Sequence, residues 1–296
     1  MTSTSLHLRT PGLRRSAHEF LRRRASQAWL QGHRDDSWEI SMPPRLQYEP
    51  LAKRFRLHAR QEARRLAEAD LFEFSQQATD TVVRAGAQLR EQLHPWTTLV
   101  HGPGKVETAS ILPPSPAGFV FWQDPHGISY LTDGTPIIAC HWGHLGHNAY
   151  WLAWWCDTYT GLKFARAEGG GAIEDQIGML AHFGPLFYAE QNLLSPCEAT
   201  PKIIGRPAGD NRGLDGGLRG SADDPDDEGD DDSVIALVYT TLATWQALTT
   251  PGPAIRLTRH APSDATVAAD RAAGLASKPV TLATTTAEGE TPPDIA

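Results

Sequence analysis

Residues 136–155 have the sequence PIIACHWGHLGHNAYWLAWW, in which two apolar and aromatic runs flank a turn-forming segment over 143–148. β-branched and aromatic runs separated by turn residues are typical of neighbouring β-strands. Residues 118–122 form a third run of this kind, and an Asp-Gly turn signal at 133–134 precedes the second run. The pattern predicts a three-stranded antiparallel meander in the middle of the chain.

Both faces of this predicted sheet are apolar. Side chains alternate between the two faces of a strand, so Cys140 and Trp142 share one face while Ile137 and Ala139 share the other. Such a sheet needs helices to cover it. We therefore expect an α+β fold with N-terminal helices, a central three-stranded antiparallel meander covered by helices, and a C-terminal helix–strand–helix–strand unit.

The apolar residues on either side of the meander recur with a helical period. Before the meander we expect an amphipathic helix over 13–31 and a long helix over 51–93, whose weakest part, 75–81, also allows two helices. After the meander we expect two short helices over 172–182 and 185–194, a helix over 233–249 N-capped by Ser233, a strand over 254–259, a helix near 263–274 and a strand over 279–284.

Composition divides the chain into parts. Residues 1–49 are expected to form a basic helical N-terminal arm, and residues 50–285 a single α+β domain. Within this domain, residues 205–232 are dense in glycine and aspartate and almost free of large apolar side chains, so they cannot bury enough surface to offset the entropy of ordering. We expect a disordered acidic insertion there and a disordered tail over 286–296.

Neither a membrane nor an oxidising compartment is indicated. No run of about 18 apolar residues occurs, so no segment is expected to span a bilayer, and the first residues lack the apolar core of a secretory signal. The three cysteines, Cys140, Cys156 and Cys197, have no disulfide-framework spacing. We expect reduced thiols and a cytoplasmic location.

Cysteine and histidine residues gather around the central turn. Cys140, His141, His144 and His147 are close in sequence, which is a pattern that favours zinc. In a hairpin, however, Cys156 would lie about 26 Å from the turn at ~3.3 Å per residue, and Cys140 would point away from His141. We therefore expect no metal site and keep His141, His144 and His147 as candidate catalytic residues at the hairpin end. An exposed turn with ordinary histidines is the alternative.

Motifs for cofactors and for common hydrolases are incomplete. Residues 102–105, Gly-Pro-Gly-Lys, lack the glycine spacing and the Ser or Thr of a P-loop. No G-x-S-x-G nucleophile elbow occurs. We expect no cofactor, and the sequence leaves open whether the protein is an enzyme.

Charge is distributed unevenly along the chain. The net charge is −8, yet residues 1–65 contain 14 basic and 6 acidic residues, and residues 221–233 contain eight acids and no base. One face of the helix predicted over 13–31 carries five arginines suited to contact phosphates, namely Arg14, Arg15, Arg22, Arg23 and Arg24. No helix-turn-helix or zinc-finger spacing accompanies them, so sequence-specific reading is not implied. An anionic membrane surface or a solvated face would suit the same arginines.

Three segments resemble a group of uncharacterised proteins from high-GC Gram-positive bacteria that has no established activity. They are Pro-Ser-Pro-Ala-Gly-Phe at 114–119, Asp-Gly-Thr-Pro at 133–136 and the aromatic strand that ends in Trp154 and Trp155. The similarity covers residues 110–285, approximately. It implies a bacterial protein, and it carries over no functional residue.

Three functions remain from this reading, the third of which is a purely structural or interaction protein that binds no nucleic acid. The first is a non-enzymatic regulatory or accessory protein that binds a macromolecule, with nucleic acid as the leading candidate, through its basic N-terminal arm. The second is an enzyme of unknown class with a histidine-lined site at the hairpin end, 141–147. A buried acid beside two of those histidines would favour the enzyme, and a continuous basic surface around helix 13–31 would favour the first. The oligomeric state is not indicated.

Overall fold

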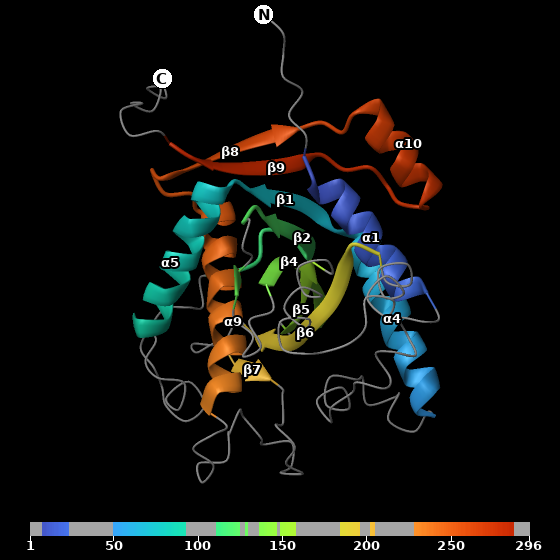
Figure 1. The fold of residues 1–296 in the computed structure, drawn as a ribbon, viewed down its shortest axis with the longest axis horizontal. Helices are drawn as coiled ribbons and strands as arrows, with labels where there is room; N and C mark the ends of the chain where they lie inside the picture. Colours follow the sequence, from blue (N-terminus) through green and yellow to red (C-terminus); the bar gives the residue numbers. More distant parts are fainter. Residues whose placement is uncertain are drawn as a thin grey trace, which may run out of the picture.

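The computed structural model describes residues 8–23, 50–92, 111–124, 128–129, 136–146, 149–157, 184–195, 202–204 and 228–286. They form three layers, with helices on both faces of a central sheet (Figure 1). The helices are α1 (Thr10–Arg22), α4 (Leu51–Glu68), α5 (Gln76–Gln92), α9 (Glu228–Thr249) and α10 (Asp264–Ala272). The strands are β1 (Asp70–Phe74), β2 (Ala117–Trp122), β3 (Ile128–Ser129), β4 (Pro136–Gly146), β5 (Ala149–Asp157), β6 (Leu186–Ser195), β7 (Lys202–Ile204), β8 (Ile255–His260) and β9 (Val280–Thr285). None of these described helices has both the length and the apolar character needed to cross a membrane.

The sheet is mixed and has nine strands among the described residues. Their order is β7-β6-β5-β4-β2-β1-β9-β8, and β3 pairs with β4 beside this path. β1 runs parallel to both of its neighbours, β2 and β9. The three predicted strands are present as β2, β4 and β5, and they pair antiparallel. The predicted three-stranded meander is nevertheless wrong in size and type, because these strands are only the middle of a larger mixed sheet.

β1 lies in the middle of the segment predicted as one helix over 51–93. Its sequence, DLFEF, is a short apolar run, and periodicity alone does not distinguish such a run from a buried helical segment. In the sheet it is buried on both faces, with Phe72 and Phe74 on the side of α5 and α9, and Leu71 on the side of α1 and α4. The predicted helix is therefore two helices separated by a central strand.

β6 replaces the helix predicted over 185–194. It pairs antiparallel with β5 along almost the whole of that strand. Tyr188 packs edge-on against Trp155, with ring centroids 5.0 Å apart. Strand pairing and packing of this kind outweigh the helical pattern of the segment. The helix predicted over 172–182 lies outside the described residues.

Buried tryptophans fill the core on both faces of the sheet. The side of α5 and α9 buries Trp122, Trp142, Trp154 and Trp245, and the side of α1 and α4 buries Trp151 and Trp155. Two of the indoles also fix α9 to the sheet. Trp122 Nε1 donates to Thr244 Oγ1, and Trp154 Nε1 donates to Thr241 Oγ1, each at 3.2 Å. The central strands β2, β4 and β5 thus supply most of the buried tryptophans of the core.

α1 packs on the sheet and is part of the core. Phe20 is fully buried there. The Glu73 carboxylate of β1 caps the first turn, because it accepts the N–H groups of Arg9 at 2.9 Å and Thr10 at 3.0 Å. The helix ends at Arg22 instead of residue 31, and residues 24–49 lie outside the described part. The residues of α1 are therefore part of the core, and the predicted domain boundary at residue 49 lies outside the described residues.

The C-terminal unit has the predicted helix–strand–helix–strand order, as α9, β8, α10 and β9. α10 follows Ser263, whose Oγ accepts the N–H of Thr266 at 3.2 Å. α9 begins at Glu228, so Ser233 lies inside the helix and is not its N-cap. Residues 228–232 of the predicted disordered insertion are therefore helical. The rest of that insertion, and the predicted tail after residue 286, lie outside the described residues.

Candidate functional site

The predicted histidine cluster is divided between two faces of the sheet. β4 continues to Gly146, so His141 and His144 are three strand positions apart and point to opposite faces. His141 is fully buried on the side of α4. His144 is exposed, and its ring lies 5.3 Å from that of Tyr150. His147 lies outside the described residues. The predicted strand ends at residue 142, whereas β4 continues to Gly146. Because of this greater length, both histidines lie on the strand and not in the turn.

His141 is held from both ring nitrogens. Trp155 Nε1 donates to its Nδ1 at 3.0 Å, and its Nε2 lies 2.7 Å from Glu62 Oε2. Because an indole N–H can only donate, Nδ1 must carry the lone pair, and Nε2 carries the proton that it donates to Glu62. The single lone pair of the neutral ring is therefore occupied. His141 has no free atom with which to accept a proton from a substrate.

Glu62 is the acid beside His141, and it was not among the predicted site residues. Its side chain is fully buried on α4 and forms an ion pair with Arg65. Burial raises the pKa of Glu62, but Arg65 and the hydrogen bond with His141 outweigh this effect and hold the pKa below its usual value. Arg65 also donates to the His144 carbonyl at 3.4 Å. The group connects α4 to β4 and β5 inside the core.

The cysteines do not join the histidines. Cys140 and Cys156 are buried with the residues that face α9, and burial raises the pKa of the Cys140 thiol. Cys197 lies outside the described residues. Within the described ranges, no group of three or more His, Cys, Asp or Glu side chains is placed to hold a metal ion. The expectation of a zinc-free protein stays a prediction.

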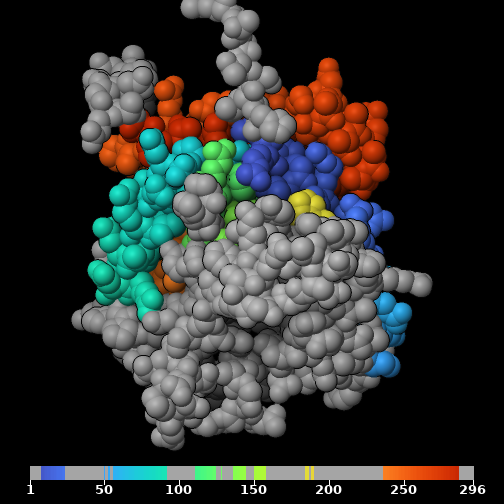
Figure 2. All heavy atoms as spheres, viewed as in Figure 1, coloured from blue at the N-terminus to red at the C-terminus, as the bar shows by residue number. Residues whose placement is uncertain are grey.

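Two of the five predicted phosphate-binding arginines form ion pairs with Asp270. Arg14 is fully buried, and its Nη2 lies 3.1 Å from Asp270 Oδ2 and donates to the Ala276 carbonyl at 3.0 Å. Arg15 Nη1 lies 2.7 Å from Asp270 Oδ1. Figure 2 shows α1 (blue) directly against the C-terminal segment (orange) to which α10 belongs. The placement of Arg14 contradicts its predicted contact with phosphate, because no nucleic acid can reach a side chain without exposed surface.

The other three arginines of the predicted set differ from one another. Arg22 is exposed and forms no ion pair with another described residue. Arg23 forms an ion pair with Glu19, four residues earlier on α1. Arg24 lies outside the described residues. Among the described residues of this set, Arg22 is therefore the arginine that best fits the predicted contact with phosphate.

A longer basic surface lies on α4. This helix contains six basic and two acidic residues. Lys53, Arg56, Arg60 and Arg64 are exposed, and their spacing of three and four residues places them along one face. Glu62 is buried on the opposite side of the helix. We name these four residues the α4 basic face. Arg60 and Arg64 were not among the predicted phosphate-binding residues, although their helical spacing from Arg56 is visible in the sequence.

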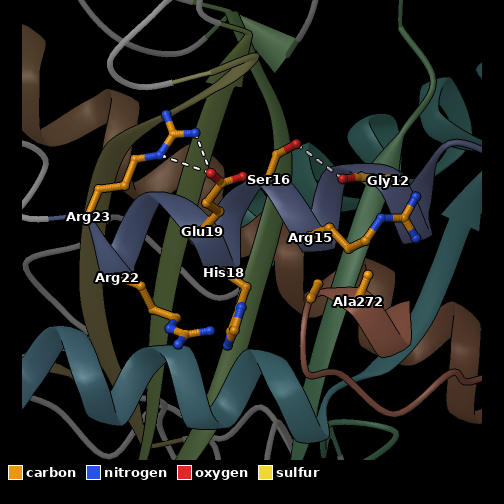
Figure 3. A pocket seen from close by; sticks show the side chains of 9 residues that line it. Gly12, Arg15, Ser16, His18, Glu19, Arg22, Arg23 and Ala272 are labelled. Atoms are coloured by element: carbon orange, nitrogen blue, oxygen red, sulfur yellow. Dashed lines mark hydrogen bonds and ion pairs between the residues drawn. The ribbon is translucent and has the colours of Figure 1, made fainter. Parts of the chain in front are cut away.

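A groove of about 740 Å³ runs along the outer side of α1 beside the end of α10. Its described lining residues are Gly12, Arg15, Ser16, His18, Glu19, Arg22, Arg23, Ala272 and Ala273 (Figure 3). Figure 3 shows the Arg22 and His18 side chains on one side of α1 and the Glu19–Arg23 pair on the other. Three of these nine residues are arginines, and the lining also includes glycine and alanine.

Comparisons of the chain with protein-family models, curated proteins and solved structures find no match. The resemblance of part of the chain to a bacterial group therefore stays a prediction. Function has to be inferred from the side chains themselves.

Proposed function

We propose that this protein is a non-enzymatic accessory protein that binds double-stranded nucleic acid through the α4 basic face. The observation that carries the proposal is the exposed row of Lys53, Arg56, Arg60 and Arg64, with no exposed acid between them. Arginine donors match phosphate oxygens, and neutralising phosphates releases counterions from the duplex. The surface differs from the predicted N-terminal arm, and the type of partner is the same.

Three of the four cations of this face lack an ion-pair partner among the described residues, although the exposed Glu68 follows Arg64 by one turn. Arg56, Arg60 and Arg64 form no ion pair within the described part of the chain. Like charges four residues apart destabilise a helix by about 0.2–0.5 kcal/mol per pair. Two such pairs, Arg56–Arg60 and Arg60–Arg64, occur in succession and span about 12 Å at 1.5 Å per residue. Because these repulsions weaken the helix, the row of arginines is better explained by contact with a binding partner than by a need for solubility.

Duplex backbone is the better-supported form of nucleic acid. Proteins that bind single strands stack the bases on aromatic side chains. Among the described residues, the one large hydrophobic side chain that is exposed is Leu112, which offers no aromatic ring. Binding should therefore rest on phosphate contacts and show little sequence preference.

The enzyme alternative has less support. The two of its predicted residues that the structure describes, His141 and His144, do not converge, and the buried acid beside His141 lies on the opposite face of the sheet from His144. The lone pair of His141 is already used by Trp155. To accept a proton at Nδ1, His141 would first have to lose the hydrogen bond from Trp155.

The test measures binding of a duplex DNA and a duplex RNA by fluorescence anisotropy at two salt concentrations. We predict that the wild-type protein binds at low salt and that Arg56→Gln/Arg60→Gln/Arg64→Gln weakens binding. Three lost phosphate contacts should make the slope of log affinity against log salt shallower by about 3. The measurement is the slope, with circular dichroism to check folding.

A matched control removes three other exposed arginines, Arg84, Arg256 and Arg259, by substitution with glutamine. This variant has the same net charge as the α4 variant and should keep most of the wild-type affinity. Equal losses of affinity in the two variants would mean that binding depends only on the overall charge, and this result would contradict the proposal. So would a wild-type protein that binds neither duplex at low salt.

A further inference from the structure

The groove along α1 and α10 contains a cation without a described counter-ion. Three arginines line it. Arg15 is paired with Asp270, and Arg23 is paired with Glu19. Arg22 is exposed and forms no ion pair with another described residue. Its guanidinium can therefore offer charge and N–H donors to a molecule in the groove.

His18 lies next to Arg22 on the same side of α1 (Figure 3). The imidazole is 7% exposed. Burial lowers the pKa of His18, and the Arg22 and Arg14 charges lower it further, with Glu19 acting in the opposite direction. His18 is therefore neutral near pH 7 and has one N–H donor.

We propose that the corner of the groove formed by Arg22 and His18 binds the phosphate group of a small molecule. Arginine presents paired N–H groups that fit two phosphate oxygens, and charge-assisted hydrogen bonds of this kind are stronger than neutral ones. The groove volume of about 740 Å³ is much larger than one phosphate and falls within the range of ligand pockets. A phosphate that carries an organic part, such as a nucleotide, therefore fits.

Glu19 is the acidic side chain among the described lining residues. Its carboxylate repels an anion in the groove and also engages Arg23. Both partners are partly exposed, so the pair itself contributes little to stability. Removing the Glu19 charge should remove this repulsion and strengthen anion binding. Substitutions at Arg22 and at Glu19 therefore have opposite expected effects, which a purely structural role would not produce.

The test is calorimetric titration of the full chain with inorganic phosphate and with a nucleoside 5′-monophosphate. Arg22→Gln should weaken binding about tenfold, because one charge-assisted hydrogen-bonded pair is lost. Glu19→Gln should strengthen binding about threefold. Arg256→Gln, which removes an exposed arginine of β8, should bind as the wild type does. Melting curves check that each variant folds.

Two outcomes support the site: similar affinity for both probes would identify the phosphate group as the ligand, and tighter binding of the nucleotide would show that the remaining volume is used. Absence of binding to the wild-type protein at millimolar probe overturns the proposal, as does wild-type affinity in Arg22→Gln. The Arg56→Gln/Arg60→Gln/Arg64→Gln variant should keep phosphate binding, so this site can fail or succeed independently of duplex binding by the α4 basic face.

Discussion

Gly118 is a position at which any larger residue would collide with the core. It pairs with Trp142 in the β2–β4 register, and a Cβ at this position would overlap the Trp142 indole. The indole cannot move freely, because its Nε1 donates to the Ser115 carbonyl at 3.0 Å. We predict that Gly118→Ala lowers the free energy of unfolding by about 1–3 kcal/mol, measured by urea denaturation. Gly252→Ala, with no atom within 4 Å of its Cβ, is the control. Similar losses in both would contradict the clash.

His58 is expected to make the stability of the protein depend on pH. It is buried on α4, with its ring centroid 4.6 Å from that of Trp151. Burial lowers its pKa to about 4, below the ordinary value of about 6.5. Between these values the unfolded chain binds a proton that the folded chain excludes, so the free energy of unfolding should rise with pH by up to about 3 kcal/mol. Denaturation at several pH values from 4 to 7 measures the slope.

The variant that tests the source of this slope is His58→Phe, which keeps a ring against Trp151. Its stability should vary less with pH over the same range. Some slope should remain, because burial also lowers the pKa of His18. Arg60→Gln changes an exposed residue of the same helix and serves as the control. An unchanged slope in His58→Phe would assign the pH dependence to other groups.

At the scale of elements, Asp270 connects α10 to α1. Its carboxylate meets Arg14 and Arg15 and also accepts from Ser277 Oγ at 3.0 Å. Removing one partner of a buried ion pair leaves an uncompensated charge. We predict that Asp270→Asn lowers the free energy of unfolding by about 3–5 kcal/mol, measured by chemical denaturation. Arg14 accounts for most of this loss, because it is fully buried while Arg15 is partly exposed.

Asp264→Asn provides the matched control for this prediction. Asp264 is exposed in the first turn of the same helix, where a carboxylate contributes about 0.3–1 kcal/mol through the helix dipole. A loss in Asp270→Asn no larger than that in Asp264→Asn would mean that the buried pair does not hold the two helices together.

At the scale of the whole molecule, β1 joins the two ends of the chain. It pairs with β2 on one side and with β9 on the other. The Glu73 carboxylate of the same strand caps α1 and also accepts from Gln123 Nε2 at 2.6 Å. The N-terminal helix, the central strands and the C-terminal unit therefore belong to one folded body. The helical period of residues 51–93 hides this strand in the sequence, because a short apolar run also fits a buried helix.

Local signals in the sequence were sufficient for the α+β class, for β2, β4 and β5, and for the order of the C-terminal unit. Each depends on features within a few residues, such as the alternation of apolar and turn residues or a helical period. The same signals failed for β1 and β6, because short apolar segments become strands or helices according to the neighbours they pair with.

The candidate sites depended still more on distant contacts. The sequence identified the basic helix over 13–31 and the histidines, but the tertiary structure alone showed that Arg14 is buried against Asp270 and that His141 is held by Glu62 and Trp155. These partners lie far apart in the chain, so no local pattern reports them. Whether an arginine meets a carboxylate or remains on the surface is a consequence of packing, and that difference separates Arg14 from the α4 basic face.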